Sequence, residues 1–91
     1  MQYYMIEWDH EEEDEPWRLY LELDSRGCSR RKVEVYRVGL YQPYDGLDEP
    51  PTDPRQLAGG DGDVTDLNRM QFDDIWEQSR QMPDGFMGMF F

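Results

Sequence analysis

The chain has 91 residues, of which 37 % are hydrophobic and 14 % aromatic, and its 21 acidic and 9 basic side chains give a formal net charge of -12. A chain of this length predicts one small domain, residues 1–91, with room for a single modest core. So negative a field repels polyanions, which excludes nucleic acid and anionic membrane surfaces as expected partners and favours a basic protein. The alternative is that the charge serves solubility alone.

The cysteine count and the hydropathy of the chain indicate where in the cell the protein is expected. Cys28 is the one cysteine, so an intramolecular disulfide and a cysteine metal cluster are excluded, in agreement with a reducing cytoplasm. No segment approaches the roughly 20 apolar residues that a membrane-spanning helix needs. The N-terminus lacks the basic flank and apolar core of a signal peptide. We therefore expect a cytoplasmic protein.

Residues 2–8 read as the first strand, because Tyr4, Ile6 and Trp8 alternate with Tyr3, Met5 and Glu7 and the segment is rich in strand-forming residues. Residues 9–15 then carry six carboxylates and one histidine in seven positions. Like charges so dense repel one another, so this run predicts a solvated loop. Pro16 ends it and favours an extended entry into the next strand.

Residues 17–38 show the most regular alternation and predict a β-hairpin at the middle of the sheet. Apolar positions repeat every second residue in both runs: Trp17, Leu19, Leu21, Leu23, Val33 and Val35. The turn between them contains Gly27, which readily takes a positive φ. After the turn at Gly39, residues 40–44 predict a short fourth strand, placed at an edge because Pro43 has no N–H.

Residues 45–63 are rich in glycine, proline and aspartate and predict a long irregular loop. Residues 67–81 predict a helix, because Phe72, Ile75, Trp76 and Ser79 recur at three- and four-residue spacing. Asn68 or Asp66 is expected to cap it.

Pro83 and Gly85 are expected to end that helix. We therefore predict an α+β fold: an antiparallel sheet of three to four strands with one C-terminal helix packed on one face. The face under the helix is expected to hold five side chains: Trp17, Leu19, Leu21, Val33 and Val35.

The last residues, 86–91, read Phe-Met-Gly-Met-Phe-Phe and are strongly apolar for a C-terminus. Such a tail either fills a gap in the core or docks on another chain. The chain is accordingly expected to be a monomer, or a homo-oligomer joined through this tail.

His10 is the main candidate for acid–base chemistry, with Asp14 or Glu15 as its carboxylate partner. No motif supplies a nucleophile or electrophile opposite it, and the alternative is a solvated loop histidine. Asp61, Asp63 and Asp66 resemble part of a calcium loop, but the twelfth residue counted from Asp61 is Phe72 instead of the required glutamate. No metal site and no cofactor are therefore predicted.

Six of the nine basic residues lie in the hairpin: Arg18, Arg26, Arg30, Arg31, Lys32 and Arg37. Next to the preceding acidic run, they predict cross-strand charge pairs. The alternative is a bipolar surface that docks on a partner in one orientation.

Three segments carry a resemblance to a known family. They are residues 6–10 (Ile-Glu-Trp-Asp-His) with 14–16 (Asp-Glu-Pro), residues 31–36 (Arg-Lys-Val-Glu-Val-Tyr), and residues 67–68 (Leu-Asn) with 72–77 (Phe-Asp-Asp-Ile-Trp-Glu). In their order and spacing the chain resembles a family of small bacterial domains without an established function. The resemblance implies an antiparallel sheet with a C-terminal helix and brings no catalytic residues. The chain departs from that pattern at residues 45–63 and in the tail.

The absence of a catalytic motif and the negative charge predict a non-enzymatic module that binds a basic protein, as an immunity protein or an inhibitor does. The acidic run is the expected contact surface: Asp9, His10, Glu11, Glu12, Glu13, Asp14 and Glu15. One alternative is a small-ligand-binding or enzymatic domain that uses His10 and the acidic loop. The other is a homo-oligomeric structural protein.

Overall fold

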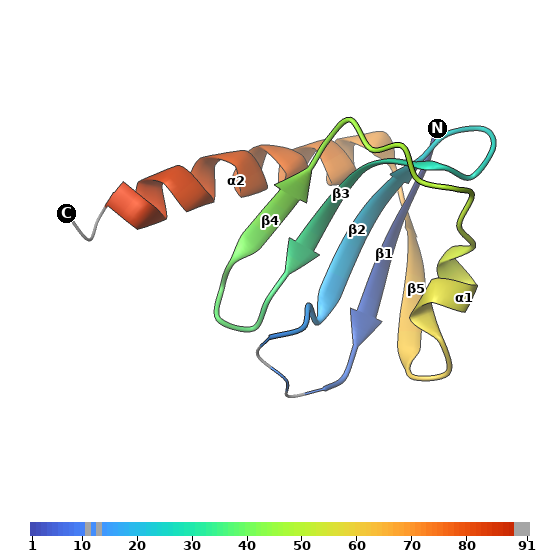
Figure 1. Ribbon diagram of the computed structural model, residues 1–91, viewed down its shortest axis with the longest axis horizontal. Helices are drawn as coiled ribbons and strands as arrows, with labels where there is room; N and C mark the ends of the chain where they lie inside the picture. Colours follow the sequence, from blue (N-terminus) through green and yellow to red (C-terminus); the bar gives the residue numbers. More distant parts are fainter. Residues whose placement is uncertain (11, 13, 89–91) are drawn as a thin grey trace.

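The computed structural model describes residues 1–10, 12 and 14–88, and the side chains of these up to residue 81. It consists of one five-stranded antiparallel sheet, in the strand order β4-β3-β2-β1-β5, and two helices (Figure 1). The elements are β1 (Gln2–Trp8), β2 (Arg18–Leu23), β3 (Ser29–Val35), β4 (Tyr41–Tyr44), α1 (Pro54–Ala58), β5 (Gly62–Leu67) and α2 (Arg69–Gly88). The α+β class is confirmed, and the sheet has one strand more than the largest number predicted.

The hairpin of β2 and β3 lies at the middle of the sheet, as its alternation predicted. β2 is the central strand, with β1 on one side and β3 on the other. Its turn is held by Asp24, whose Oδ1 accepts hydrogen bonds from the backbone N–H groups of Arg26 and Cys28 at 2.9 and 3.0 Å. Gly27 takes the positive φ, 85°, that the turn requires.

The sheet has a core on each face, whereas the alternation of apolar residues predicted a single core. Directly paired residues of antiparallel strands lie on the same face, and the register pairs Val33 with Tyr20 and Leu21 with Lys32. Val33 and Val35 therefore lie with Tyr20 under α2, together with Tyr3, Phe72 and Trp76. The prediction that α2 buries Leu19 and Leu21 is wrong, because these side chains point to the opposite face.

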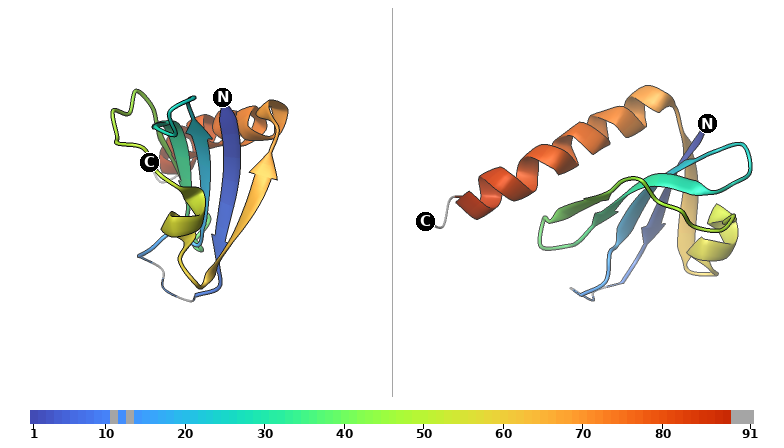
Figure 2. Two further views of the ribbon diagram at one scale, coloured as in Figure 1. Left: turned by 90° about the vertical axis from the view of Figure 1, so that its right-hand side faces the viewer. Right: turned by 45° about the horizontal axis from the view of Figure 1, so that its top comes forward.

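On the opposite face α1 packs against β1 and β5 (Figure 2). Its core contains Ile6, Leu19, Leu21, Leu23 and Ala58. α1 begins at Pro54, and its N-cap Asp53 accepts a hydrogen bond from the backbone N–H of Arg55 at 3.0 Å. Residues 45–63 thus differ from the predicted irregular loop, since they contain α1 and the start of β5.

β5 pairs along its whole length with β1 from Tyr3 to Trp8, and it forms one edge of the sheet. Its sequence, Gly-Asp-Val-Thr-Asp-Leu, alternates weakly and includes two aspartates, which are uncommon in strands. β4 forms the other edge and contains Pro43, as predicted.

α2 begins with a reciprocal cap, since the backbone N–H of Gln71 donates to Asn68 Oδ1 and that of Asn68 donates to Gln71 Oε1, both at 2.8 Å. Phe72, Trp76 and Ser79 are buried along its predicted apolar stripe. The predicted end of the helix is wrong, because α2 continues through Pro83 and Gly85 to Gly88. A proline removes one helical hydrogen bond and does not always end the helix.

The end of α2 extends past β4 (Figure 1). Residues 89–91 lie outside the described part of the chain, so the two alternatives for the apolar tail stay predictions. Among the described residues, neither helix combines the length and the hydropathy needed to cross a membrane.

Candidate functional site

Two tryptophans lie side by side at the end of the sheet where β1 stops and β2 begins. The backbone N–H of Trp8 donates to the carbonyl oxygen of Trp17 at 2.9 Å, and that of Trp17 donates to Val35 at 2.9 Å. The two indoles belong to different cores, because Trp17 packs with the cluster under α2 and Trp8 with the cluster under α1. Trp8 Nε1 donates to the Ala58 carbonyl oxygen at 2.9 Å, which fixes the ring.

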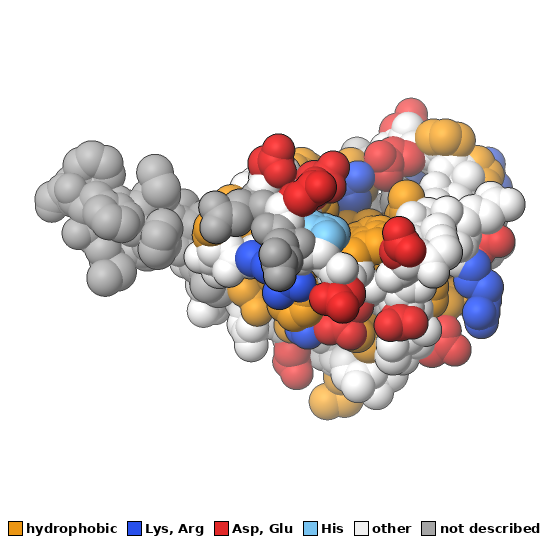
Figure 3. Space-filling view, turned by 90° about the horizontal axis from the view of Figure 1, so that it is seen from below, with side chains coloured by type: hydrophobic (Ala, Val, Ile, Leu, Met, Phe, Trp, Pro, Cys, Tyr) orange, Lys and Arg blue, Asp and Glu red, His pale blue; other side chains and the backbone are white. Residues whose placement is uncertain are grey.

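Carboxylates from two segments surround these tryptophans, and we call this surface the acidic end. Its described members are Glu7, Asp9, Glu12, Asp14, Glu15 and Asp63. The pairing of β1 with β5 sets Asp63 directly opposite Glu7 and thereby brings the second segment to this end. Seen from below, acidic side chains border a hollowed patch of hydrophobic side chains, with basic side chains among them (Figure 3).

The loop between β1 and β2 is tied to the turn between β3 and β4 by Arg37. Its Nε donates to the carbonyl oxygen of His10 at 2.6 Å, and its Nη2 lies 4.0 Å from Asp9 Oδ1. The same guanidinium lies 5.0 Å from the centroid of the Trp17 ring. A cation and an aromatic ring in this arrangement attract each other, so Arg37 holds the acidic loop against the sheet.

Both ring nitrogens of His10 are engaged. Nδ1 lies 3.2 Å from the backbone nitrogen of Glu12, and Nε2 lies 3.0 Å from the carbonyl oxygen of Pro16. The amide N–H of Glu12 donates to Nδ1, and Nε2 faces the carbonyl oxygen of Pro16, which can only accept. Through these two contacts His10 holds the loop, and the acid–base role considered from the sequence stays a prediction.

Two small hollows flank Trp8. One, of about 240 Å³, is lined by Trp8, His10, Glu15 and Pro16. The other, of about 210 Å³, is lined by Glu7, Trp8, Asp9, Trp17, Arg37 and Asp63. Both are smaller than the roughly 300–1,000 Å³ of small-molecule sites, and they suit single side chains better than a metabolite.

The carboxyl of Glu15 has a raised pKa, chiefly because it shares a hydrogen bond with the neighbouring Glu12 and because the charge of Glu12 repels a second negative charge. Asp9, Glu12, Asp14 and Glu15 are exposed, and His10 is half-buried. Glu11 and Glu13, also predicted as contact residues, lie outside the described residues.

The candidate calcium ligands do not converge. Asp63 pairs with Glu7 and Asp66 with Tyr4, which places these two aspartates on opposite faces of β5. Among residues 1–10, 12 and 14–88, no group of three or more histidine, cysteine, aspartate or glutamate side chains is arranged to hold a metal ion.

The predicted cross-strand charge pairs are present, and at least six of the nine basic side chains lie within 4.0 Å of a carboxylate. Arg18 and Glu7 lie opposite each other on β2 and β1, with Nη2 2.6 Å from Oε2. Most basic side chains are thus used within the molecule, and they leave carboxylates in excess at its surface.

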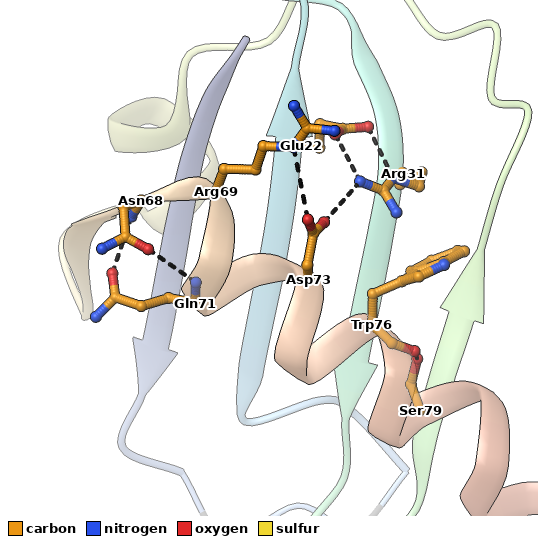
Figure 4. Close-up of polar contacts among 8 residues, drawn as sticks. All are labelled: Glu22, Arg31, Asn68, Arg69, Gln71, Asp73, Trp76 and Ser79. Atoms are coloured by element: carbon orange, nitrogen blue, oxygen red, sulfur yellow. Dashed lines mark hydrogen bonds and ion pairs between the residues drawn. The ribbon is translucent and has the colours of Figure 1, made fainter.

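A second charged cluster lies between the sheet and α2 (Figure 4). Arg31 donates to Glu22 from Nε at 2.9 Å and from Nη2 at 2.7 Å, and it reaches Asp73 of α2 at 3.2 Å. Its guanidinium lies 5.0 Å from the ring centroids of both Phe72 and Trp76. These groups pair with one another between the sheet and α2, so the cluster fixes the helix to the sheet.

Sequence reasoning identified the acidic run and missed the rest of the acidic end. Trp17 was expected under the helix, whereas Arg37 and Asp63 come from the β3–β4 turn and from β5, which are distant in the sequence. The one available signal was the placement of an aromatic residue at each strand end that flanks the acidic run.

The family model for the domain of unknown function DUF6881 matches residues 2–49, just over half of the chain. The match spans β1 to β4 and includes the acidic loop, both tryptophans of the acidic end and Arg37, whereas α1, β5 and α2 follow it. No curated protein and no solved structure matches the chain significantly. The sheet, the acidic loop and this match agree with the resemblance seen in the sequence: the chain belongs to the DUF6881 family, a domain of unknown function.

Proposed function

We propose that this chain is a non-enzymatic module that binds a basic protein through its acidic end, in the manner of an inhibitor or an immunity protein. The observation that carries the proposal is the meeting of six described carboxylates around two tryptophans at one end of the sheet. Carboxylates at a rim speed the encounter with a basic partner, and aromatic side chains at its centre supply contact area.

Two further observations support a binding role. Arg18 pairs with Glu7 and Arg37 with Asp9 at this end. The other ion pairs of the basic side chains lie elsewhere in the molecule, so the acidic end keeps a local excess of carboxylates. The bonds of His10 to Glu12 and Pro16 give this histidine a role in holding the loop.

The free thiol of Cys28 suits the reducing cytoplasm, which we propose as the location of the module.

The test is a stopped-flow measurement of association with a blocked twelve-residue peptide of alternating lysine and glycine, at low and at physiological salt. A triple variant, Glu12→Gln, Asp14→Asn and Glu15→Gln, removes three charges from the acidic end. The matched control, Asp66→Asn, Asp74→Asn and Glu77→Gln, removes three exposed charges elsewhere.

We expect the first variant to associate about tenfold more slowly than wild type at low salt, with a weaker salt dependence, because local charges steer the encounter. The control should lose much less. Equal effects of the two variants would show a diffuse field without a binding surface, and absence of binding to wild type would overturn the proposal.

A further inference from the structure

Arginine side chains in this molecule are held repeatedly by an aromatic ring together with a carboxylate. Arg18 lies 4.2 Å from the centroid of the Trp17 ring and 2.6 Å from Glu7. In the same way, the Arg31 guanidinium lies 5.0 Å from the centroid of the Trp76 ring, and its Nη2 lies 2.7 Å from Glu22 Oε2. A guanidinium suits such a pair, since its flat face stacks on the ring while its edge donates to the carboxylate.

Trp8 is the one tryptophan of the three that no lysine or arginine covers within the described part of the chain. Its ring is nevertheless fixed in place, because Nε1 donates to Ala58 and the backbone of Gly62 packs against it so closely that a Cβ there would lie 2.8 Å from Nε1. A ring held in this way loses little freedom when a ligand stacks on it.

The carboxylate that completes the arrangement is Glu15, which lines the hollow of about 240 Å³ beside Trp8, with Pro16 and His10 as the other walls. The hollow thus offers apolar walls and a negative rim, a match for a long side chain with a cationic end.

We propose that this hollow receives an arginine side chain of the basic partner, with the guanidinium stacked on Trp8 and paired with Glu15. The inference rests on the proposed function and names its central contact. The raised pKa of Glu15 supports it, because a guanidinium beside Glu15 and Glu12 offsets their mutual repulsion.

The test uses NMR of the ¹⁵N-labelled chain, whose three indole N–H signals report separately on Trp8, Trp17 and Trp76. The probe is a blocked pentapeptide with arginine at the centre of four glycines. The matched probe carries citrulline instead of arginine, which keeps the shape and removes the charge.

We expect the Trp8 signal to shift in a saturable manner with the arginine peptide and not with the citrulline peptide. Glu15→Gln should weaken that binding about fivefold, as loss of an exposed charge pair does, whereas Asp74→Asn should leave it unchanged. Glu15 is an exposed loop residue, so the variant keeps the fold.

Two outcomes overturn the inference and remain separate from a failure of the proposed function. If the arginine peptide shifts backbone signals of the acidic end but not the Trp8 indole, the surface binds cations elsewhere and the arginine hollow is wrong. If no signal shifts while the lysine–glycine peptide still associates at the acidic end, the proposed function stands without this contact.

Discussion

Arginine 31 shows how single residues fix this small domain. It lies opposite Glu22 in the register of β2 and β3, and the Glu22 side chain is only 8 % exposed. A buried carboxylate destabilises the fold unless a cation lies beside it. The Arg31 guanidinium is that cation, and it donates two hydrogen bonds to the carboxylate. The same guanidinium reaches Asp73, so one side chain ties the central hairpin to the C-terminal helix.

Replacing Arg31 by methionine should lower the free energy of unfolding by about 3 kcal/mol, because it leaves Glu22 buried without its partner. Arg30→Met is the control, since Arg30 is half-exposed and lies 3.9 Å from Asp24; it should cost at most about 0.5 kcal/mol. Urea unfolding followed by tryptophan fluorescence measures both, and equal losses would contradict a special role for Arg31.

A second residue-scale effect depends on pH. Glu34 Oε1 accepts hydrogen bonds from Tyr36 and Tyr44, each at 3.0 Å. Burial, followed by this hydrogen bond and the charge of Glu34, raises the pKa of Tyr36 from 10.0 to about 12. Between these two values the folded chain keeps a proton that the unfolded chain has lost.

The contribution of Tyr36 to stability is therefore complete below pH 10 and is lost as the pH rises towards about 12. We expect Tyr36→Phe to show a shallower fall in stability across this range than wild type. Urea unfolding at several pH values from 9 to about 11.5 checks this. Parallel curves for the two proteins would contradict the assignment.

At the scale of elements, the sequence correctly predicted the elements that depend on a local pattern of residues. β1, the β2–β3 hairpin, the edge strand at Pro43 and the cap at Asn68 follow from alternation, turn residues and capping chemistry within short segments. β5 was missed because two aspartates break its pattern, and its pairing with β1 is what makes it a strand. The presence of a core on each face was missed because alternation shows only which residues of one strand share a face. The register of the hairpin decides on which face of the sheet the valines of β3 lie.

The packing of α1, β5 and β1 converges on Gly62. A Cβ at this position would lie 2.7 Å from the Ala58 carbonyl oxygen and 2.8 Å from Trp8 Nε1. Gly62→Ala should therefore cost about 1–3 kcal/mol and displace the Trp8 indole. Gly60→Ala is the control, because open space surrounds that position. Unfolding curves and the Trp8 indole signal measure the effect, and an unshifted indole would contradict the close packing.

The attachment of α2 depends on the apolar stripe that the sequence predicted. Trp76 is 7 % exposed and stacks on Phe72 with a centroid separation of 6.3 Å. Trp76→Ala should cost about 3–5 kcal/mol and abolish or greatly lower cooperative thermal unfolding. Met70→Ala on the same helix, where Met70 is 76 % exposed, should leave the melting curve nearly unchanged. Similar curves for both variants would contradict the packing of α2 on the sheet.

At the scale of the whole molecule, the acidic end illustrates what a sequence conceals. The run at residues 9–15 is visible because its carboxylates are adjacent in the chain. Arg37 and Asp63 join it only after β1 pairs with β5 and the β3–β4 turn closes over the loop. The net charge was predictable from the sequence. The distribution of that charge over the surface depends on which carboxylates pair with basic side chains in the fold.

The net charge of -12 makes a prediction about salt. Two effects compete when salt is added, since screening weakens the ion pairs and also weakens the repulsion among the unpaired carboxylates. The closest pairs, such as Arg31 with Glu22, are partly buried and are screened little. The repulsion acts between exposed groups over distances near or above the Debye length of about 10 Å at 0.1 M, and salt removes most of it.

Relief of repulsion should therefore prevail, and the melting temperature should rise between about 10 and 200 mM sodium chloride. A gain of about 1 kcal/mol corresponds to roughly 4–8 °C for a domain of this size. The triple variant Glu12→Gln, Asp14→Asn and Glu15→Gln begins with less repulsion, so its melting temperature should be higher at low salt and rise less. Calorimetry on both proteins measures this, and a melting temperature that falls with salt would show that attractive pairs dominate the electrostatics of the fold.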